Sequence, residues 1–214
     1  MTGTARTVYL HGFASSPRSN KATFFQRRFA EHGVSLDVPQ LDEGNFEALT
    51  ITRQMKVIDR AVGTGPAILI GSSLGGYLAA LYAAHHSNIE RVILMAPAFQ
   101  FPKRWRERFP AEELALWKRE GSRKFYHYSF QEERPLGYGF VEDADRYEDE
   151  PDFKQPGLIL HGTADPVVPV DVSCQFAASH PNVTLRLFEA GHELTDVLEQ
   201  LWVETAMFLG FQKL

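Results

Sequence analysis

The chain has 214 residues, of which 44% are hydrophobic, so it is long enough for one domain with an ordinary core. Its formal net charge of −5 gives no electrostatic reason to bind nucleic acid or an anionic membrane. One cysteine excludes an intramolecular disulfide framework, and no apolar run is long enough to span a bilayer. The short polar N-terminus has no signal-peptide pattern, so we expect a cytoplasmic protein.

Strands and helices alternate along the chain. Six apolar runs predict strands, at residues 7–10, 35–38, 67–70, 92–95, 158–160 and 184–188. Segments between and after them predict helices, at residues 19–31, 51–62, 74–86 and 194–209. Most of the strands are rich in Val, Ile and Leu throughout, as expected where both faces of a parallel sheet are covered. The pattern predicts an α/β fold with a mostly parallel, doubly wound sheet of about six strands.

The most informative motif is Gly71-Ser72-Ser73-Leu74-Gly75, which joins a predicted strand to a predicted helix. Gly-x-Ser-x-Gly in this context is typical of a nucleophile elbow, a tight turn that exposes the serine hydroxyl at the edge of the sheet. The glycines leave free the space that a Cβ atom would occupy, and their spacing selects the second serine. We therefore predict Ser73 as a nucleophile.

Two later loops carry the partners that a serine nucleophile needs. Asp165 lies in the turn after the strand at 158–160, and His192 follows the strand at 184–188. A serine hydroxyl is a weak nucleophile near neutral pH, so His192 would accept its proton. Asp165 would fix the histidine tautomer and stabilise the imidazolium. The order serine, acid, histidine is the one expected after such an elbow.

The segment after the first strand, His11-Gly12-Phe13, predicts one half of an oxyanion hole. In this arrangement one donor is the backbone N–H of the residue after the nucleophile, and the other comes from the loop after the first core strand. We assign these donors to the backbone N–H groups of Leu74 and Phe13.

These motifs resemble those of the α/β-hydrolase superfamily and, more narrowly, of the YqiA-type esterases. The narrower resemblance rests on three segments: residues 9–22 (Tyr-Leu-His-Gly-Phe-Ala-Ser-Ser-Pro-Arg-Ser-Asn-Lys-Ala), 38–41 (Val-Pro-Gln-Leu) and 71–77 (Gly-Ser-Ser-Leu-Gly-Gly-Tyr). The resemblance implies an α/β-hydrolase fold and a serine esterase or thioesterase that cleaves a small acyl ester or thioester through an acyl-enzyme, without a cofactor. The same triad also serves in amide and carbon–carbon hydrolases, and some proteins of this fold only bind ligands or partners.

Residues 99–153 interrupt the alternation and predict a small cap inserted into a single domain of residues 1–214. Two short helices are expected at 102–109 and 111–120, and extended segments at 123–130 and 137–141. This segment is longer and more aromatic than in YqiA-type proteins, and is nearer to the cap of mitochondrial depalmitoylating hydrolases. Trp105 and Trp117 are candidates to line a pocket for an acyl chain, although aromatic residues also form the core of a small cap.

Other polar groups have simpler interpretations. The basic residues Lys103, Arg104, Arg106 and Arg108 could meet substrate phosphates, but a solvated helix face is the simpler reading. His11 and His161 each precede a glycine at a strand end, and no clustered ligand spacing accompanies them, so we expect no metal site.

Overall fold

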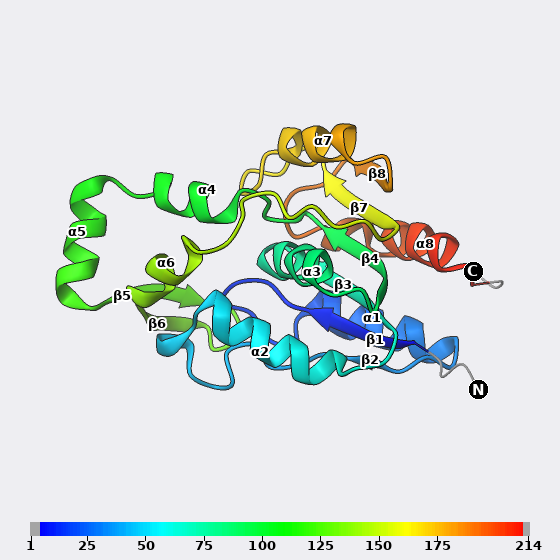
Figure 1. The fold of residues 1–214 in the computed structure, drawn as a ribbon, viewed down its shortest axis with the longest axis horizontal. Helices are drawn as coiled ribbons and strands as arrows, with labels where there is room; N and C mark the ends of the chain where they lie inside the picture. The colour runs from blue at the N-terminus through cyan, green and yellow to red at the C-terminus, as the bar shows by residue number, and fades with distance from the viewer. Residues whose placement is uncertain (1–4, 212–214) are drawn as a thin grey trace.

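The structure is a computed structural model and describes residues 5–211. Its centre is a sheet in the order β2-β1-β3-β4-β7-β8, in which all neighbouring strands run parallel (Figure 1). The strands are β1 (Arg6–Leu10), β2 (Leu36–Asp37), β3 (Ala67–Ser72), β4 (Ile89–Met95), β7 (Gly157–Gly162) and β8 (Val183–Phe188). The predicted six-stranded, doubly wound α/β architecture is confirmed.

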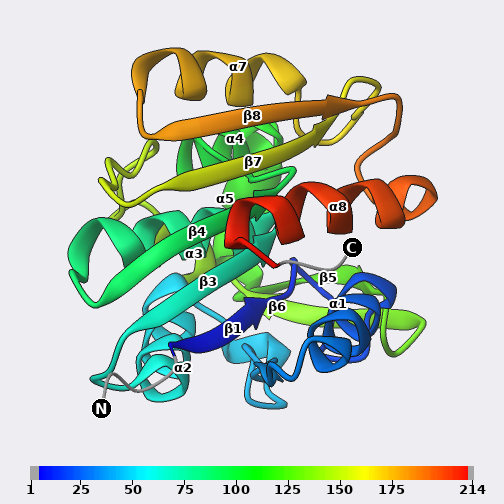
Figure 2. The same cartoon turned by 90° about the vertical axis from the view of Figure 1, so that its right-hand side faces the viewer.

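Helices cover both faces of this sheet. They are α1 (Asn20–Glu31), α2 (Ile51–Val62), α3 (Leu74–His85), α7 (Val170–Ser179) and α8 (Leu198–Leu209), with short 3₁₀ turns η1 (Phe46–Ala48) and η2 (Thr195–Val197). On one face, Phe25 and Phe29 of α1 pack in one buried cluster with Trp202 of α8. Figure 2 shows these two helices on the near side of the sheet. The other face is covered by α2, α3 and α7.

Local signals explain where the helices begin and end. The Ser19 and Thr50 side chains cap α1 and α2 by accepting hydrogen bonds from the backbone N–H groups of Ala22 and Arg53. Helix α2 ends at Gly63, whose φ of 68° suits glycine. The last helix begins later than predicted, because Leu194 has a φ of 55° and the chain makes a 3₁₀ turn before α8. Between residues 5 and 211 no helix is long and apolar enough to cross a membrane.

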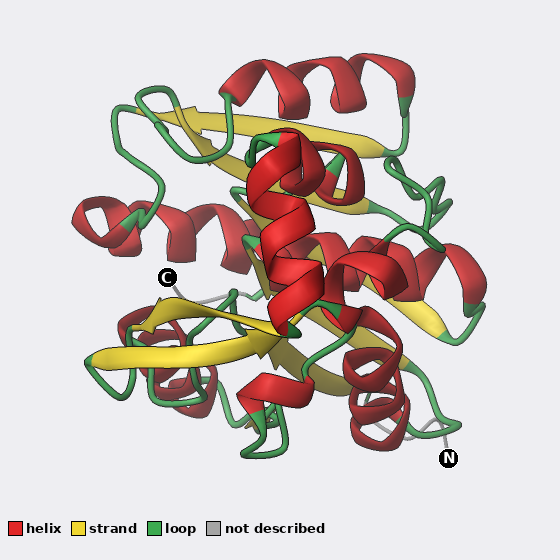
Figure 3. Cartoon of the chain, turned by 90° about the vertical axis from the view of Figure 1, so that its left-hand side faces the viewer, coloured by secondary structure: helices red, strands yellow, loops and turns green. Residues whose placement is uncertain are grey.

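The segment from 99 to 153, called the insert below, lies between β4 and β7 in the chain. It contains α4 (Phe101–Glu107), α5 (Ala111–Glu120), the antiparallel pair β5 (Ser122–His127) and β6 (Glu132–Gly137), and α6 (Gly139–Ala144). Figure 1 shows these elements beyond the carboxyl ends of the strands, and Figure 3 views them in front of the sheet. The insert therefore stands at the sheet edge where loops that follow the strands converge.

The two predicted short helices of the insert are confirmed, but the extended segment at 137–141 is wrong. Gly137 ends β6 opposite Ser122, and the chain then turns into helix α6. Phe140 and Ala144 are both buried and stand four residues apart, a spacing that places them on one side of a helix. The inward packing of these residues overrides the extended preference suggested by Tyr138 and Phe140.

Candidate active site

Ser73 lies at a strained turn between β3 and α3. Its φ of 55° and ψ of −118° fall in a region that non-glycine residues rarely adopt. A Cβ atom on Gly71 would overlap the Gly75 carbonyl group, and one on Gly75 would overlap the Leu10 carbonyl group. The turn is held by a 2.9 Å hydrogen bond from the Ser73 backbone N–H to the Met95 carbonyl oxygen. The structure thus has the close-packed, strained geometry expected of a nucleophile elbow.

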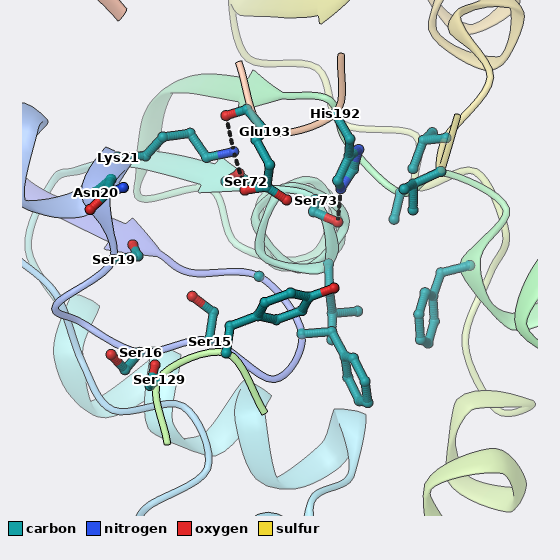
Figure 4. Close-up of a pocket in the computed structure, with 18 of the residues that line it drawn as sticks. Ser15, Ser16, Ser19, Asn20, Lys21, Ser72, Ser73, Ser129, His192 and Glu193 are labelled. Atoms are coloured by element: carbon teal, nitrogen blue, oxygen red, sulfur yellow. Dashed lines mark hydrogen bonds and ion pairs between the residues drawn. The ribbon is translucent and has the colours of Figure 1, made fainter. Parts of the chain in front are cut away.

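The side chains of Ser73, His192 and Asp165 form one hydrogen-bonded chain. The distance from Ser73 Oγ to His192 Nε2 is 2.9 Å (Figure 4), and the distance from His192 Nδ1 to Asp165 Oδ2 is 2.7 Å. Because a carboxylate accepts at Nδ1, this nitrogen carries the proton and Nε2 is free to accept from the serine hydroxyl. The structure therefore brings the three predicted residues together in an order that can move a proton from serine to histidine.

Asp165 is held as an anion by four donors. Its Oδ1 accepts hydrogen bonds of 2.8 Å from both the Val167 and Val168 backbone N–H groups, while Oδ2 faces His192 and His161. Burial alone would raise the pKa of this carboxyl group, but the hydrogen bonds from His161, His192 and Val168 outweigh it and hold the pKa far below its usual value. Asp165 is therefore charged throughout the neutral range.

His161 is a neighbour of Asp165, and its position before a glycine at a strand end predicted only a turn. It is fully buried at the end of β7. Its Nε2 lies 3.2 Å from Asp165 Oδ2 and 3.0 Å from the Val168 carbonyl oxygen, so this nitrogen must be a donor. Its Nδ1 lies 2.7 Å from Ser173 Oγ on α7. His161 thus ties the acid to the sheet and to α7.

The loop that carries His192 approaches the acid loop closely. A Cβ atom on Gly162 would overlap the Ala190 carbonyl group, and the Ala164 backbone N–H donates to the same carbonyl oxygen at 3.1 Å. Glycine at position 162 therefore allows the close approach on which the His192–Asp165 contact depends.

Phe13 and Leu74 are the residues whose backbone N–H groups are predicted to stabilise an oxyanion. Both residues line the same cavity as Ser73, and within residues 5–211 neither N–H donates a hydrogen bond. Leu74 is the first residue of α3, where helix N–H groups lack intrahelical partners.

His11, two residues before Phe13, is buried. Its Nε2 accepts a hydrogen bond from the Leu41 backbone N–H, and burial lowers its pKa. His11 thus packs as a neutral structural residue behind this loop.

The cavity above Ser73 has a volume of about 1070 Å³ and receives residues from both the sheet loops and the insert. Trp105 lines it together with Phe99, Phe101 and Val168. Trp117 does not, because its indole is buried inside the insert and donates to the Leu136 carbonyl oxygen at 2.9 Å. Of the two tryptophans that were candidates to line the pocket, the structure therefore places only Trp105 at the cavity.

Lys21 is a cavity residue to which the sequence assigned no role. It lies in the first turn of α1 and is buried, and its Nζ donates to the Glu193 carbonyl oxygen at 2.7 Å (Figure 4). Burial lowers the pKa of this ammonium group, and the carboxylates of Glu193 and Asp165 oppose the shift. Lys21 thus fastens the His192 loop to α1.

Among the described residues, no group of three or more His, Cys, Asp or Glu side chains could hold a metal ion.

Solved α/β-hydrolases share this fold over nearly the whole chain. Alpha/beta hydrolase domain-containing protein 10 from mouse aligns with a TM-score of 0.81 and 21% identity, covering 100% of this chain and 92% of that one. Est1E from Butyrivibrio proteoclasticus, with ferulic acid bound, gives 0.76 and 20%, with 97% and 91% covered. Paleococcus ferrophilus monoacylglycerol lipase gives 0.70 and 19%, with 95% and 93% covered. The chain therefore has the α/β-hydrolase fold.

One family model also matches the sequence itself. Residues 6–209 match the model of the uncharacterised protein family UPF0227. The match spans all six strands of the central sheet and the insert.

Proposed function

We propose that this chain, which belongs to the uncharacterised protein family UPF0227 and has the α/β-hydrolase fold, is a serine hydrolase of carboxylic esters or thioesters. The observation that carries the proposal is the hydrogen-bonded chain Ser73–His192–Asp165 at a strained turn. The backbone of Ser73 is strained, and such strain is typical of functional sites. Here it would hold the hydroxyl toward a substrate. The fold alone would not specify activity, since related folds also serve in binding.

The reaction would run through an acyl-enzyme. Ser73 Oγ attacks the carbonyl carbon and forms the new C–O bond while its proton passes to His192 Nε2. The Phe13 and Leu74 N–H groups would stabilise the oxyanion, each by about 3–4 kcal/mol. The tetrahedral intermediate then expels the alcohol or thiol, which takes the proton from His192. A water molecule, activated by His192, cleaves the acyl-enzyme and restores Ser73.

We further propose that residues 1–214 form a single hydrolase domain in which the insert acts as a cap over the nucleophile. Its support is the shared cavity, to which the insert contributes Phe101 and Trp105 and the sheet loops contribute Ser73 and His192. A wall of aromatic side chains on one side of the nucleophile suits an apolar acyl group. The proposed substrate is therefore a small ester or thioester with such a group.

A fluorophosphonate probe tests the activity directly, because it phosphonylates only an activated serine. We expect the wild-type protein to label at one site, with the adduct on the peptide that contains Ser73. Ser73→Ala should not label, whereas the matched neighbour variant Ser72→Ala should. A folded wild-type protein that never labels would instead support a binding protein on this fold.

A further inference from the structure

The two sides of the cavity differ in chemistry. The apolar wall consists of Phe99, Phe101, Trp105 and Val168, and two arginines, Arg104 and Arg108, lie beside it. Another part of the lining, the donor wall, consists of Ser15, Ser16, Arg18, Ser19, Asn20 and Lys21. Figure 4 shows Ser15, Ser16, Ser19, Asn20 and Lys21 together on one side of Ser73. A substrate that fills both sides must therefore have one apolar and one strongly polar half.

The charged residues of the cavity are unbalanced. Four cations line it, namely Arg18, Lys21, Arg104 and Arg108, against the single carboxylate of Glu193. The whole chain has the opposite balance, with 22 Lys and Arg against 27 Asp and Glu. Within residues 5–211, none of these three arginines forms an ion pair. The cavity is thus a local positive region in an acidic protein, a distribution that attracts anionic ligands.

The basic run of α4 is divided between the cavity and the solvent. Arg104 and Arg108 line the cavity, four residues apart on the face that also carries Trp105. Arg104 donates to the Val167 carbonyl oxygen at 2.7 Å, and the Arg108 guanidinium lies 5.7 Å from the centre of the Trp105 ring. Lys103 is exposed outside the cavity, and Arg106 pairs with Asp145. The expectation of a solvated face therefore holds for Lys103, Arg106 and Arg108, which are exposed, whereas Arg104 is half-buried.

Lys21 has donors to spare in the donor wall. Its ammonium group carries three N–H bonds and is buried, yet it makes one hydrogen bond, to the Glu193 carbonyl oxygen. The Glu193 carboxylate lies 3.9 Å away and is itself largely exposed, which makes it a weak partner. Arg18 stands three residues earlier and is exposed. Among residues 5–211, a buried cation with unused donors thus lines the same cavity as an arginine without an ion pair, and both are suited to bind an anion.

The catalytic geometry indicates which half of the substrate meets the donor wall. The leaving group must lie within hydrogen-bond reach of His192 Nε2, because that nitrogen returns the proton. The residue after it, Glu193, is bound to Lys21, so the donor wall adjoins the histidine loop. Resting on the proposed hydrolase activity, we propose that the donor wall binds the leaving group of the ester, and that this leaving group carries a carboxylate or a phosphate.

Four matched esters test this proposal. Three are hexanoate esters of 4-hydroxybenzoate, 4-hydroxyphenyl phosphate and the neutral 4-hydroxybenzamide, and the fourth is the adipate monoester of 4-hydroxybenzamide, with the charge at the acyl end. Each kcat/KM is divided by the rate constant of that ester with hydroxide, which removes differences in intrinsic reactivity. We expect at least one anionic phenol to exceed the neutral phenol by about tenfold or more, and the ratio to fall as NaCl is added.

The arms of the experiment have distinct meanings. A larger gain for the carboxylate or for the phosphate identifies the anion. Equal values for all three phenols would overturn the proposal, and a gain for the adipate ester alone would overturn the assignment of the donor wall to the leaving group. Hydrolysis of the neutral hexanoate ester and labelling of Ser73 report separately on the proposed hydrolase activity, so the two proposals can fail independently.

Charge-removing variants locate the effect. Arg18→Gln should lower the anionic-to-neutral ratio about fivefold or more, because no ion pair in the described part of the chain occupies the charge of Arg18. Lys103→Gln is the matched control: it removes the same charge from a position outside the cavity and should leave the ratio unchanged. An unchanged ratio in Arg18→Gln, or an equal fall in both variants, would contradict the role of the donor wall.

Discussion

The sheet loops and the insert both line the cavity, but their residues are held in different ways. Ser73, Asp165 and His192 are fixed by backbone hydrogen bonds and close glycine contacts at the ends of strands. The insert is held mainly by aromatic packing, such as the contacts of the Trp105 ring with those of Phe125 and Phe140 at 5.6 and 5.4 Å. In the proposed enzyme, the chemical step would therefore depend on the hydrogen-bonded sheet loops, and substrate selectivity on the aromatic packing of the insert.

The two regions meet at the loop after β1. The Phe13 ring packs among insert rings, 5.0 Å from Trp105 and 5.6 Å from Phe125, and Phe13 also lines the cavity. The Tyr128 backbone N–H, beyond β5, donates to the Ala14 carbonyl oxygen at 2.9 Å. Substitutions in the insert can therefore alter the loop that carries the proposed oxyanion donor. Kinetic measurements on variants of each region can separate their effects.

The largest loss of activity should come from a substitution in the sheet loops. Ser73→Ala removes the hydroxyl proposed to form the acyl-enzyme, so kcat should fall by about 10⁴-fold or more. The measurement is turnover of a p-nitrophenyl ester, with circular dichroism to show that the fold remains. Alanine keeps the Cβ atom, so the backbone strain at position 73 is unchanged and the melting temperature should change little. Wild-type turnover by a folded Ser73→Ala protein would end the serine-hydrolase proposal.

A substitution at Asp165 should cause the next largest loss of activity. Asp165→Asn keeps the size of the side chain but favours the wrong tautomer of His192, so kcat should fall by as much as about 10⁴-fold. Asp171→Asn, an exposed carboxylate at the start of α7, is the matched control and should be nearly silent. If Asp165→Asn were nearly silent and another carboxylate variant inactive, the acid would have been misassigned.

Asp165 should also influence stability at acidic pH. Its pKa is depressed in the folded protein, so it contributes stability that is present above the usual pKa of about 3.9 and is lost as the pH falls below that value. The wild-type free energy of unfolding should therefore decrease on acidification below about pH 4, and less steeply in Asp165→Asn. Urea titrations at a series of pH values measure this, and equal slopes would contradict it.

His161 should have a smaller effect that acts through the acid. His161→Phe removes a donor to the Asp165 carboxylate while keeping the ring volume, and a hydrogen bond to a charged group contributes about 1.5–3 kcal/mol. We expect kcat to fall about tenfold with KM little changed, and the acidic limb of the pH–rate profile to move. His161→Gln, which can restore a donor toward Asp165, should recover part of the rate. A fall in stability alone, with an unchanged pH profile, would assign His161 a purely structural role.

The sequence could predict the strands and the loops that follow them because the signals for these elements are local. Ser73, Asp165 and His192 each follow an apolar strand within a few residues, and parallel strands bring such loops to one edge. Lys21 and His161 were missed as site residues because their partners depend on tertiary contacts: Lys21 meets Glu193, which lies 172 residues away. Trp105 and Trp117 could not be separated, since both are aromatic residues on short helices and only packing decides which one faces the cavity.

The smallest and most selective effect should come from these two tryptophans. Each buried methylene contributes about 0.8 kcal/mol, close to fourfold in kcat/KM, so an apolar wall should favour medium acyl chains over acetate. Trp105→Ala should flatten the rise of kcat/KM along p-nitrophenyl acetate, butyrate and hexanoate, more than it lowers acetate turnover. Trp117→Ala, an equally buried residue outside the cavity, should lower the melting temperature and keep the slope.

Trp117 thus controls for damage to the aromatic core, because it contacts the same Phe125 ring as Trp105, at 5.3 Å. If both variants flattened the slope equally, the acyl preference would reside in the packing of the insert as a whole and not in the Trp105 surface. A wild-type profile that favoured acetate and stayed unchanged in both variants would show that the insert packs only on itself. A flattened slope in Trp105→Ala alone would assign acyl selectivity to the insert and leave the chemical step to the sheet loops.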